Sequence, residues 1–274
     1  MNDGLGVAVK RTALKAFSRL WRLRVLNPIL RKVGLDYHKF ATLVLVQRNL
    51  MEPDKSFCLQ RVFKGFCLEL DITKPTQRLI YIPYRPELHL ERRLIRLLTE
   101  RTVFFDIGAH IGYYTMLVAS EPSRRVFSFE PSAANYQYLL RNINLNRFGN
   151  VRAFKFAISN ATGQANLHNN PLNDGGNSLQ QFHGYSDLST ELVQTYMLDD
   201  FVHDHAVRRV DIIKIDVEGH ERKGLLGAAE VLRKDRPKIL IESSAAPGEL
   251  FDFLKQFGYS RFERLDNDGN FFAR

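Results

Sequence analysis

Cysteine is scarce in this 274-residue sequence, which contains only two such residues. Cys58 and Cys67 stand on adjacent strand-like segments, 57–63 and 66–73, so a cross-strand disulfide is geometrically conceivable. So few cysteines cannot form a disulfide framework or a zinc cluster, and we expect two reduced thiols in a cytosolic protein. Hydrophobic residues make up 45% of the chain, enough to bury a core without such crosslinks.

Long hydrophobic runs are also missing. Charged residues interrupt each apolar stretch before it reaches the roughly 18 residues that a membrane-spanning helix needs. Residues 1–6 have no basic start and no apolar core after them, so we expect no secretory signal peptide. The sequence therefore predicts a soluble or peripheral protein.

Acidic residues are outnumbered by basic ones, and the net charge is +9. Much of the excess lies within residues 10–35, where basic and apolar residues alternate as in an amphipathic helix. This segment either rests on an acidic membrane surface or packs on the rest of the protein with its charges in water. Nucleic acid is the less favoured partner, because the C-terminal half has no aromatic and basic platform for stacked bases.

Changes of pattern along the chain predict three parts: a helical extension (1–55), a small β cap with a lead-in helix (56–100) and a main domain (101–274). In the main domain apolar runs alternate with helical segments. The expected strands are 103–107, 126–129, 151–158, 210–217 and 238–242, and the expected helices are 111–120, 133–146, 221–233 and 249–257. Such alternation predicts an α/β fold with a mostly parallel sheet, closed by an antiparallel hairpin at 259–273.

A turn rich in small residues follows the first expected strand, with the sequence Asp106-Ile-Gly108-Ala-His110-Ile-Gly112. Glycines let the backbone turn tightly and approach a ligand, and the following helix offers unpaired N–H groups. Ligands of open α/β sheets bind at the carboxyl ends of the strands, where the strand order reverses. The dinucleotide pattern G-x-G-x-x-G is absent, which argues against a nicotinamide enzyme.

Glu130 ends the second expected strand. A carboxylate at this position can accept hydrogen bonds from ribose hydroxyls in doubly wound nucleotide-binding proteins. Asp106 would then face a cationic end of the same ligand, where a negative charge is favourable. The alternative is that Glu130-Pro131-Ser132 only starts a helix.

Several segments together resemble the FkbM-type methyltransferases. They are 103–115, 129–131 with Asn135, Leu139 and Asn142, 157–159 with Gly163, 198–200, 211–221 with 225–228, and 237–242. The resemblance runs from about Leu68 to the C-terminus, and 211–221 is its most specific part. It implies a Rossmann-like class I methyltransferase that uses S-adenosyl-methionine, has a mostly parallel seven-stranded sheet and usually methylates oxygen in sugars, glycans or natural products. The alternatives are a nucleic-acid methyltransferase and a non-catalytic protein of the same fold that binds the cofactor or a membrane.

The resemblance also adds Asn135 and Ala157 to the expected cofactor-binding residues, beside Asp106, Gly108, His110, Gly112 and Glu130. His110 stands where this family usually has Asn. Either side chain can form a hydrogen bond with the cofactor carboxylate or with neighbouring backbone, so we keep His110 in the predicted site.

Three polar residues follow the fourth expected strand: Asp216, Glu218 and His220. Methyl transfer needs an aligned acceptor and a base that removes its proton. We expect Asp216 to anchor the substrate or a divalent ion, and Glu218 or His220 to act as the base. The alternative is that 218–221 only caps a helix.

Three further features have less specific interpretations. Lys214 lies within an apolar strand, and we expect it to pair with a carboxylate. Asp216, Glu218 and Glu242 could present oxygen ligands to magnesium, although no motif in the sequence supports a metal. The polar segment 169–185 suits either contact with a hydroxyl-rich acceptor or a solvated loop, and its candidate residues are Asn173, Asp174, Asn177, Ser178 and His183.

Overall fold

The structure is a computed structural model that describes residues 58–63, 65–81, 88–170, 173–181, 189–243, 248–266 and 269–274. The chain divides into two compact units, Met1–Arg61 with Leu70–Arg85, and Val62–Glu69 with Pro86–Arg274. The expected helical extension (1–55), with its basic segment 10–35, lies outside the described residues and stays a prediction.

Residues 58–81 correct one expectation of β structure. Strands β1 (Cys58–Phe63) and β2 (Phe66–Asp71) form a two-stranded sheet, as expected. The next segment is a helix, α4 (Pro75–Tyr81), where we had expected a further β-prone run. Pro75 suits the first helical position, because the N–H that it lacks would have no partner within the helix.

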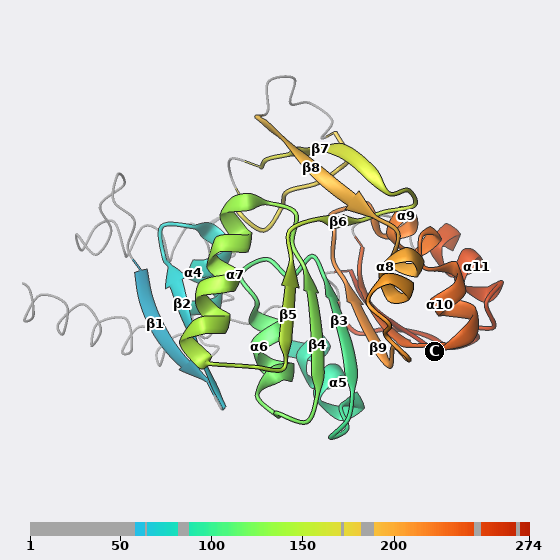
Figure 1. The fold of residues 1–274 in the computed structure, drawn as a ribbon, viewed down its shortest axis with the longest axis horizontal. Coiled ribbons are helices and arrows are strands. Elements are labelled where there is room, and N and C mark those ends of the chain that lie inside the picture. The colour runs from blue at the N-terminus through green and yellow to red at the C-terminus, as the bar shows by residue number, and fades with distance from the viewer. Residues whose placement is uncertain are drawn as a thin grey trace, which may run out of the picture. The chain divides into compact units, whose positions relative to one another are not determined.

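The larger unit contains a seven-stranded sheet in the order β11-β12-β10-β9-β3-β4-β5. Figure 1 shows the part of this sheet from β9 through β3 and β4 to β5. Its strands are β3 (Val103–Ile107), β4 (Arg125–Phe129), β5 (Val151–Phe154), β9 (Ile212–Ile215), β10 (Lys238–Glu242), β11 (Phe262–Arg264) and β12 (Asn270–Ala273). The strands from β10 to β5 are parallel, whereas β12 pairs antiparallel with both β10 and β11. This arrangement confirms the predicted class I methyltransferase fold.

Both faces of this sheet are buried because its strands carry apolar side chains on alternate sides. Phe105 belongs to a core with α8 (Leu198–Asp204), α10 (Ala229–Lys234) and α11 (Gly248–Lys255). Its neighbour Phe104 belongs to a second core with α5 (Leu88–Leu97) and α6 (Tyr113–Ala119). The sheet is therefore held from both sides, which keeps the carboxyl ends of its strands in place.

Two expected elements are divided in the structure. The expected strand 151–158 becomes β5 and β6 (Ala157–Ile158), which belong to different sheets, because Phe156 packs with the aromatic rings of Phe129 and Phe201 instead of continuing the ladder. The expected helix 221–233 becomes α9 (Glu221–Leu226) and α10. They separate near Gly227, where an added Cβ would stand 2.0 Å from the Ser159 carbonyl oxygen.

Part of the stretch between the expected strands 151–158 and 210–217, where no element was predicted, is also ordered. β7 (Gly163–His168) and β8 (Thr190–Tyr196) pair antiparallel, and β6 pairs with β8 to complete a three-stranded sheet. Helix α8 follows, and it too was not predicted. Short strands with exposed, polar outer faces carry little hydrophobic periodicity, which explains why the sequence pattern missed them.

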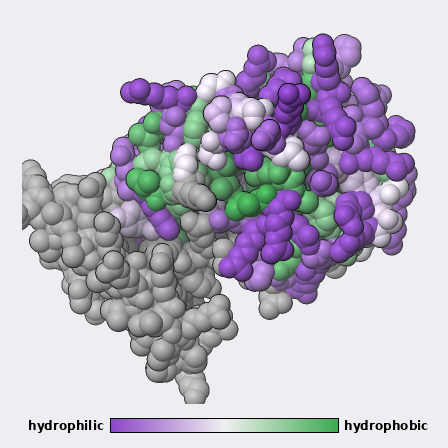
Figure 2. Space-filling model, turned by 90° about the horizontal axis from the view of Figure 1, so that it is seen from below, coloured by the Kyte–Doolittle hydropathy of each residue, from purple (hydrophilic) through white to green (hydrophobic). Residues whose placement is uncertain are grey.

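The described surface is mainly hydrophilic on the face seen in Figure 2, with hydrophobic residues gathered near its centre. No helix in the part of the chain that the structure describes has the length and apolar character needed to span a bilayer. Cys58 and Cys67 are both reduced thiols in the structure.

Candidate active site

The candidate site lies where the strand order of the main sheet reverses. β3 is flanked by β4 on one side and by β9 on the other, with Asp106 level with Lys214. The turns after β3 and β9 touch, since a Cβ added to Gly108 would stand 1.8 Å from the Asp216 carbonyl oxygen. Gly108 also has a φ of +78°, which favours glycine. The fold thus brings two predicted site segments together.

Asp106 is a buried carboxylate with one satisfied oxygen. Its Oδ2 accepts a hydrogen bond of 2.6 Å from the Thr115 hydroxyl, which also lies 2.7 Å from Ser128 Oγ. Its Oδ1 is buried and has no hydrogen-bond partner among the described residues. Burial raises the pKa of Asp106, against the lowering effects of the Lys214 ammonium and the Thr115 hydroxyl. An unsatisfied carboxylate oxygen of this kind is suited to a donor from a ligand.

Glu130 forms a bridge between two backbone segments. Its Oε2 accepts a 2.8 Å hydrogen bond from the His110 N–H, and its Oε1 accepts one of 3.0 Å from the Ser132 N–H. Burial raises its pKa, while His110, Ser132 and the Asn135 side chain lower it. A carboxylate offers about four lone-pair directions, so these contacts leave room for further donors. The contact with Ser132 agrees with the interpretation of Glu130-Pro131-Ser132 as a helix start, and it leaves Glu130 able to bind a ligand as well.

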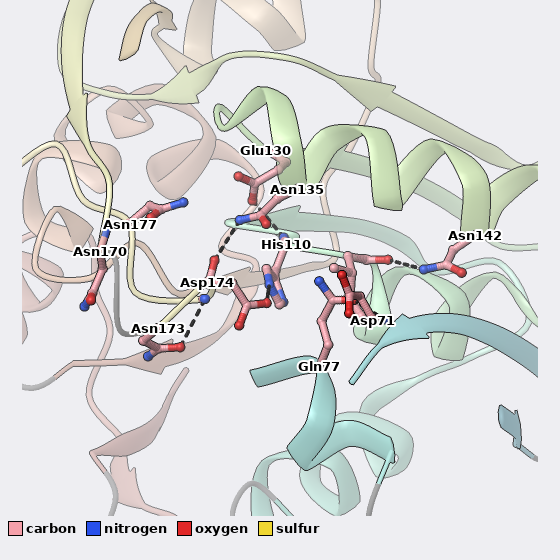
Figure 3. Close-up of polar contacts among 12 residues, drawn as sticks. Asp71, Gln77, His110, Glu130, Asn135, Asn142, Asn170, Asn173, Asp174 and Asn177 are labelled. Carbon is pink, nitrogen blue, oxygen red and sulfur yellow. Dashed lines mark hydrogen bonds and ion pairs between the residues drawn. The ribbon is translucent and has the colours of Figure 1, made fainter. Parts of the chain in front are cut away.

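His110 and Asn135 both contact Asp174, a residue of the polar segment 169–185 whose partners the sequence did not predict (Figure 3). His110 Nε2 lies 3.0 Å from Asp174 Oδ2, and Asn135 Nδ2 donates a 2.9 Å hydrogen bond to the Asp174 carbonyl oxygen. His110 has a φ of +52°, a conformation that Asn tolerates better than most residues. Gly112 has a φ of +92°, which favours glycine, and an added Cβ would stand 2.6 Å from the Leu139 Cδ1 atom on α7 (Ala133–Asn146).

Lys214 pairs with a carboxylate, as predicted. Its ammonium donates to Asp216 Oδ2 at 3.0 Å and lies 5.1 Å from the centre of the Tyr114 ring. The lysine is 3% exposed, so this pairing offsets the cost of burying its charge. The ion pair also fixes the Asp216 side chain at the rim of the β9 turn.

Glu218 is partly buried in a left-handed backbone conformation, with a φ of +53°. Burial raises its pKa to about 7, and the nearby Asp216 and Glu221 carboxylates contribute to the increase. Lys214 acts in the opposite direction. A carboxyl group with this pKa can release and accept a proton near neutral pH.

His220 is directed away from solvent. Its ring is 5% exposed, and Nε2 lies 2.9 Å from the Ser159 hydroxyl. Burial, with a smaller contribution from the Lys223 charge, lowers its pKa to about 4, so the imidazole is neutral at physiological pH. Its Nδ1 is buried and has no hydrogen-bond partner among the residues described.

Comparison with known proteins identifies the family of this chain. The model of the Methyltransferase FkbM domain matches residues 106–261, which is more than half of the chain. This chain belongs to the FkbM methyltransferase family. It is therefore an S-adenosyl-methionine-dependent methyltransferase, and the predicted family and enzyme class are confirmed.

Individual relatives are more distant. The hexuronic acid methyltransferase AglP of Haloferax volcanii is 26% identical over 191 residues, covering 68% of this chain and 77% of the relative. The 2-O-methyltransferase NoeI of Sinorhizobium fredii is 27% identical over 169 residues, covering 54% and 67%. The crystal structure of a methyltransferase FkbM from Methylobacillus flagellatus KT aligns with a TM-score of 0.47 and 17% identity, covering 91% of this chain and 70% of that one.

Two expectations about this methyltransferase are left without added support. Ala157 is 7% exposed and pairs with Thr195 in the three-stranded sheet, so its cofactor role stays a prediction. Among the residues described there is no group of three or more His, Cys, Asp or Glu side chains that could hold a metal ion.

Sequence reasoning missed two polar residues near the site of this methyltransferase, Thr115 and Ser128, and it named Asp174 and Ser178 without predicting what they contact. Thr115 and Ser128 support Asp106 and are both fully buried. A polar residue at a core-facing position of a helix or strand is the signal that could have identified them. Asp174 and Ser178 lie in a loop without periodicity, so no local pattern predicts their partners.

Proposed function

We propose that this chain transfers a methyl group from S-adenosyl-methionine to a hydroxyl group of a sugar-like acceptor. The observation that supports this proposal is the contact between the turns after β3 and β9. Asp106 and Glu130 lie beside the first turn, and the second contains Glu218, whose pKa is raised to about 7. The names of the relatives AglP and NoeI support a sugar hydroxyl as acceptor.

The residues present fit S-adenosyl-methionine. Asp106 has a buried oxygen that can accept from the cofactor ammonium, and Glu130 can accept from ribose hydroxyls. Four carboxyl groups, of Asp106, Asp216, Glu218 and Glu221, lie around the single Lys214 ammonium at the two turns. A sulfonium cation bound beside them would favour their ionised forms and be attracted by them. The bound cofactor supplies an electrophilic methyl group.

Among the three proposed catalytic residues, Glu218 fits the role of general base. Its carboxylate can take the proton of the acceptor hydroxyl as the oxygen attacks the methyl carbon, and a pKa of about 7 matches working pH. Asp216, paired with Lys214, would orient the acceptor. His220 is held by Ser159 and has a pKa near 4, so it would support the turn instead of exchanging the proton.

Two measurements test this function. Calorimetry with S-adenosyl-methionine and S-adenosyl-homocysteine should show binding of both by the folded protein. Labelled cofactor should then transfer methyl groups to hexuronic-acid-containing or neutral oligosaccharides and not to RNA. Transfer to RNA alone would replace the acceptor class, and the absence of cofactor binding would refute the proposal.

A further inference from the structure

Residues 173–181 connect the two turns of the site. β7 leads into this segment, and the backbones of His168 and Ser178 exchange hydrogen bonds of 2.8 and 3.1 Å at its base. Gly176 is closely surrounded, because an added Cβ would stand 2.9 Å from Asn170. We call residues 173–181 the strap.

One end of the strap contacts the turn after β3. Asp174 contacts the His110 side chain through its carboxylate and the Asn135 side chain through its carbonyl oxygen (Figure 3). His110 in turn donates its backbone N–H to Glu130. This end is therefore linked by direct contacts to the residues proposed to hold the cofactor.

The other end contacts the turn after β9. Ser178 is 1% exposed, and its hydroxyl donates a 2.7 Å hydrogen bond to the Glu218 carbonyl oxygen. The same hydroxyl accepts a 2.9 Å hydrogen bond from the Gln180 N–H. The Gln180 side-chain amide donates to the carbonyl oxygen of Gly219. Two consecutive carbonyl groups of the β9 turn are thus held by the strap.

These two carbonyl contacts matter because the β9 turn has an unusual backbone. Glu218 and Gly219 both have positive φ, of +53° and +95°. A side chain other than glycine adopts this conformation only when surrounding contacts hold it there. The orientation of the Glu218 Cα–Cβ bond therefore depends on the strap, and small displacements of a catalytic group reduce rates strongly.

We propose that the strap is a positioning element for methyl transfer, in which Ser178 and Gln180 hold the Glu218–Gly219 turn so that the Glu218 carboxylate faces the acceptor hydroxyl. Asp174 ties this turn to His110 on the cofactor side. The proposal rests on the proposed function, because it assumes that Glu218 is the base.

Replacement of Ser178 and Gln180 by alanine tests the proposal. Gln164→Ala on β7 is the matched control, because Gln164 is exposed. Each variant is measured for binding of S-adenosyl-homocysteine, for kcat with the oligosaccharide that the wild type methylates best, and for the Glu218 titration by carboxyl ¹³C NMR. The charged groups that act on Glu218 are Asp216, Glu221 and Lys214, which lie outside the strap, so a shifted titration reports burial and orientation of the carboxylate.

We expect Ser178→Ala to lower kcat by about 30-fold and Gln180→Ala by about fivefold, as misplacement of a catalytic group would. The Glu218 midpoint should fall from about 7 toward its ordinary 4.5 as water reaches the carboxylate. Binding of S-adenosyl-homocysteine should stay within about twofold of wild type, since neither side chain contacts the proposed cofactor residues. Gln164→Ala should match wild type in all three measurements.

A kcat or a Glu218 midpoint at the wild-type value in the folded variants would overturn the proposal, as would equal losses of kcat and cofactor affinity. If Ser178→Ala does not fold, the test is decided by Gln180→Ala, because Gln180 is exposed and its replacement should leave folding intact. A wild-type protein that neither binds nor transfers would overturn the proposed function and the strap together, whereas an active wild type with unaffected variants would overturn the strap alone.

Discussion

The turn after β3 and the turn after β9 occupy equivalent places at adjacent strand ends, yet they differ in chemistry. In the β3 turn the backbone donors are already used, because Gly108 and Ala109 donate to Phe129 and His110 donates to Glu130. In the β9 turn the carbonyl groups of Glu218 and Gly219 are held by a distant loop. The first turn is supported by its own neighbours, and the second depends on the strap.

The carboxylates differ in the same way. Asp106 is fully enclosed and supported by a buried hydroxyl pair, which suits a fixed partner for a cation. Glu218 is partly exposed beside two other carboxylates that help raise its pKa to about 7. The comparison teaches that one strand edge can hold a binding carboxylate and a titrating one, because burial and neighbouring charges set each pKa separately.

The largest expected effect comes from separating the two turns. Gly108→Ala would place a Cβ 1.8 Å from the Asp216 carbonyl oxygen at a φ of +78°. We expect the free energy of unfolding to fall by about 3 kcal/mol or more, from backbone strain and overpacking combined. Thermal and urea unfolding measure this. Gly149→Ala is the control, since nothing lies within 4 Å of its Cβ position, and equal losses in both would contradict the close approach.

The next effect tests the chemical role of the β9 turn. Glu218→Gln keeps the shape but removes the base, so kcat should fall by about 100-fold or more. In the wild type kcat should rise with pH through a midpoint near 7, because the base works only after it loses its proton. The pH dependence of kcat should lose this rise in Glu218→Gln.

The control for Glu218→Gln is Glu230→Gln, at an exposed glutamate of α10. If His220 were the base instead, the rise would be centred near pH 4 and would disappear in His220→Gln. That outcome would assign the proton transfer to the residue held by Ser159.

A smaller effect tests the support of the β3 side. Thr115→Val removes the hydroxyl that donates to Asp106, at a position that is fully buried. Loss of this contact should cost about 1–3 kcal/mol of stability. Because the hydroxyl lowers the pKa of Asp106, its loss raises that pKa further.

Both folded proteins bind the proton of Asp106 more tightly than the unfolded chain does, and the folded variant binds it more tightly than the folded wild type. The stability difference from wild type should therefore be smallest below the raised pKa that Asp106 has in the folded wild type, and should grow as the pH rises through that pKa. Urea unfolding at several pH values measures this. Thr162→Val, at an exposed hydroxyl that donates to Asp200, should show no such growth.

The smallest effect concerns the family-typical residue. His110→Asn removes the contact with Asp174 but keeps a side chain suited to the positive φ. We expect the affinity for S-adenosyl-homocysteine to change by no more than about threefold, with a similar decrease in kcat. His203→Asn, which breaks an exposed His–Asp contact, is the control. A loss of cofactor binding beyond tenfold, or about 1.4 kcal/mol, would show that His110 itself contacts the ligand.

The main sheet was predictable because its strands are short apolar runs and its helices show hydrophobic stripes. Expected bounds for β3, α7, β10 and β12 agree with the structure. The prediction was wrong at 151–158, where one apolar run forms two strands that belong to different sheets. It also missed polar strands such as β7, whose hydrophobic periodicity is too weak to recognise. Burial in the tertiary structure, which local pattern does not report, decided these cases.

By itself the sequence determined the α/β sheet, the family and the two turns that meet at its strand ends. Local periodicity and short motifs are sufficient for this, because they act through neighbours along the chain. Only the tertiary structure decided that Asp174 contacts His110, 64 residues away, and that Ser178 supports Glu218, 40 residues away. Such polar contacts form when a loop is closed by the rest of the fold, so their partners depend on the folded arrangement of the whole domain.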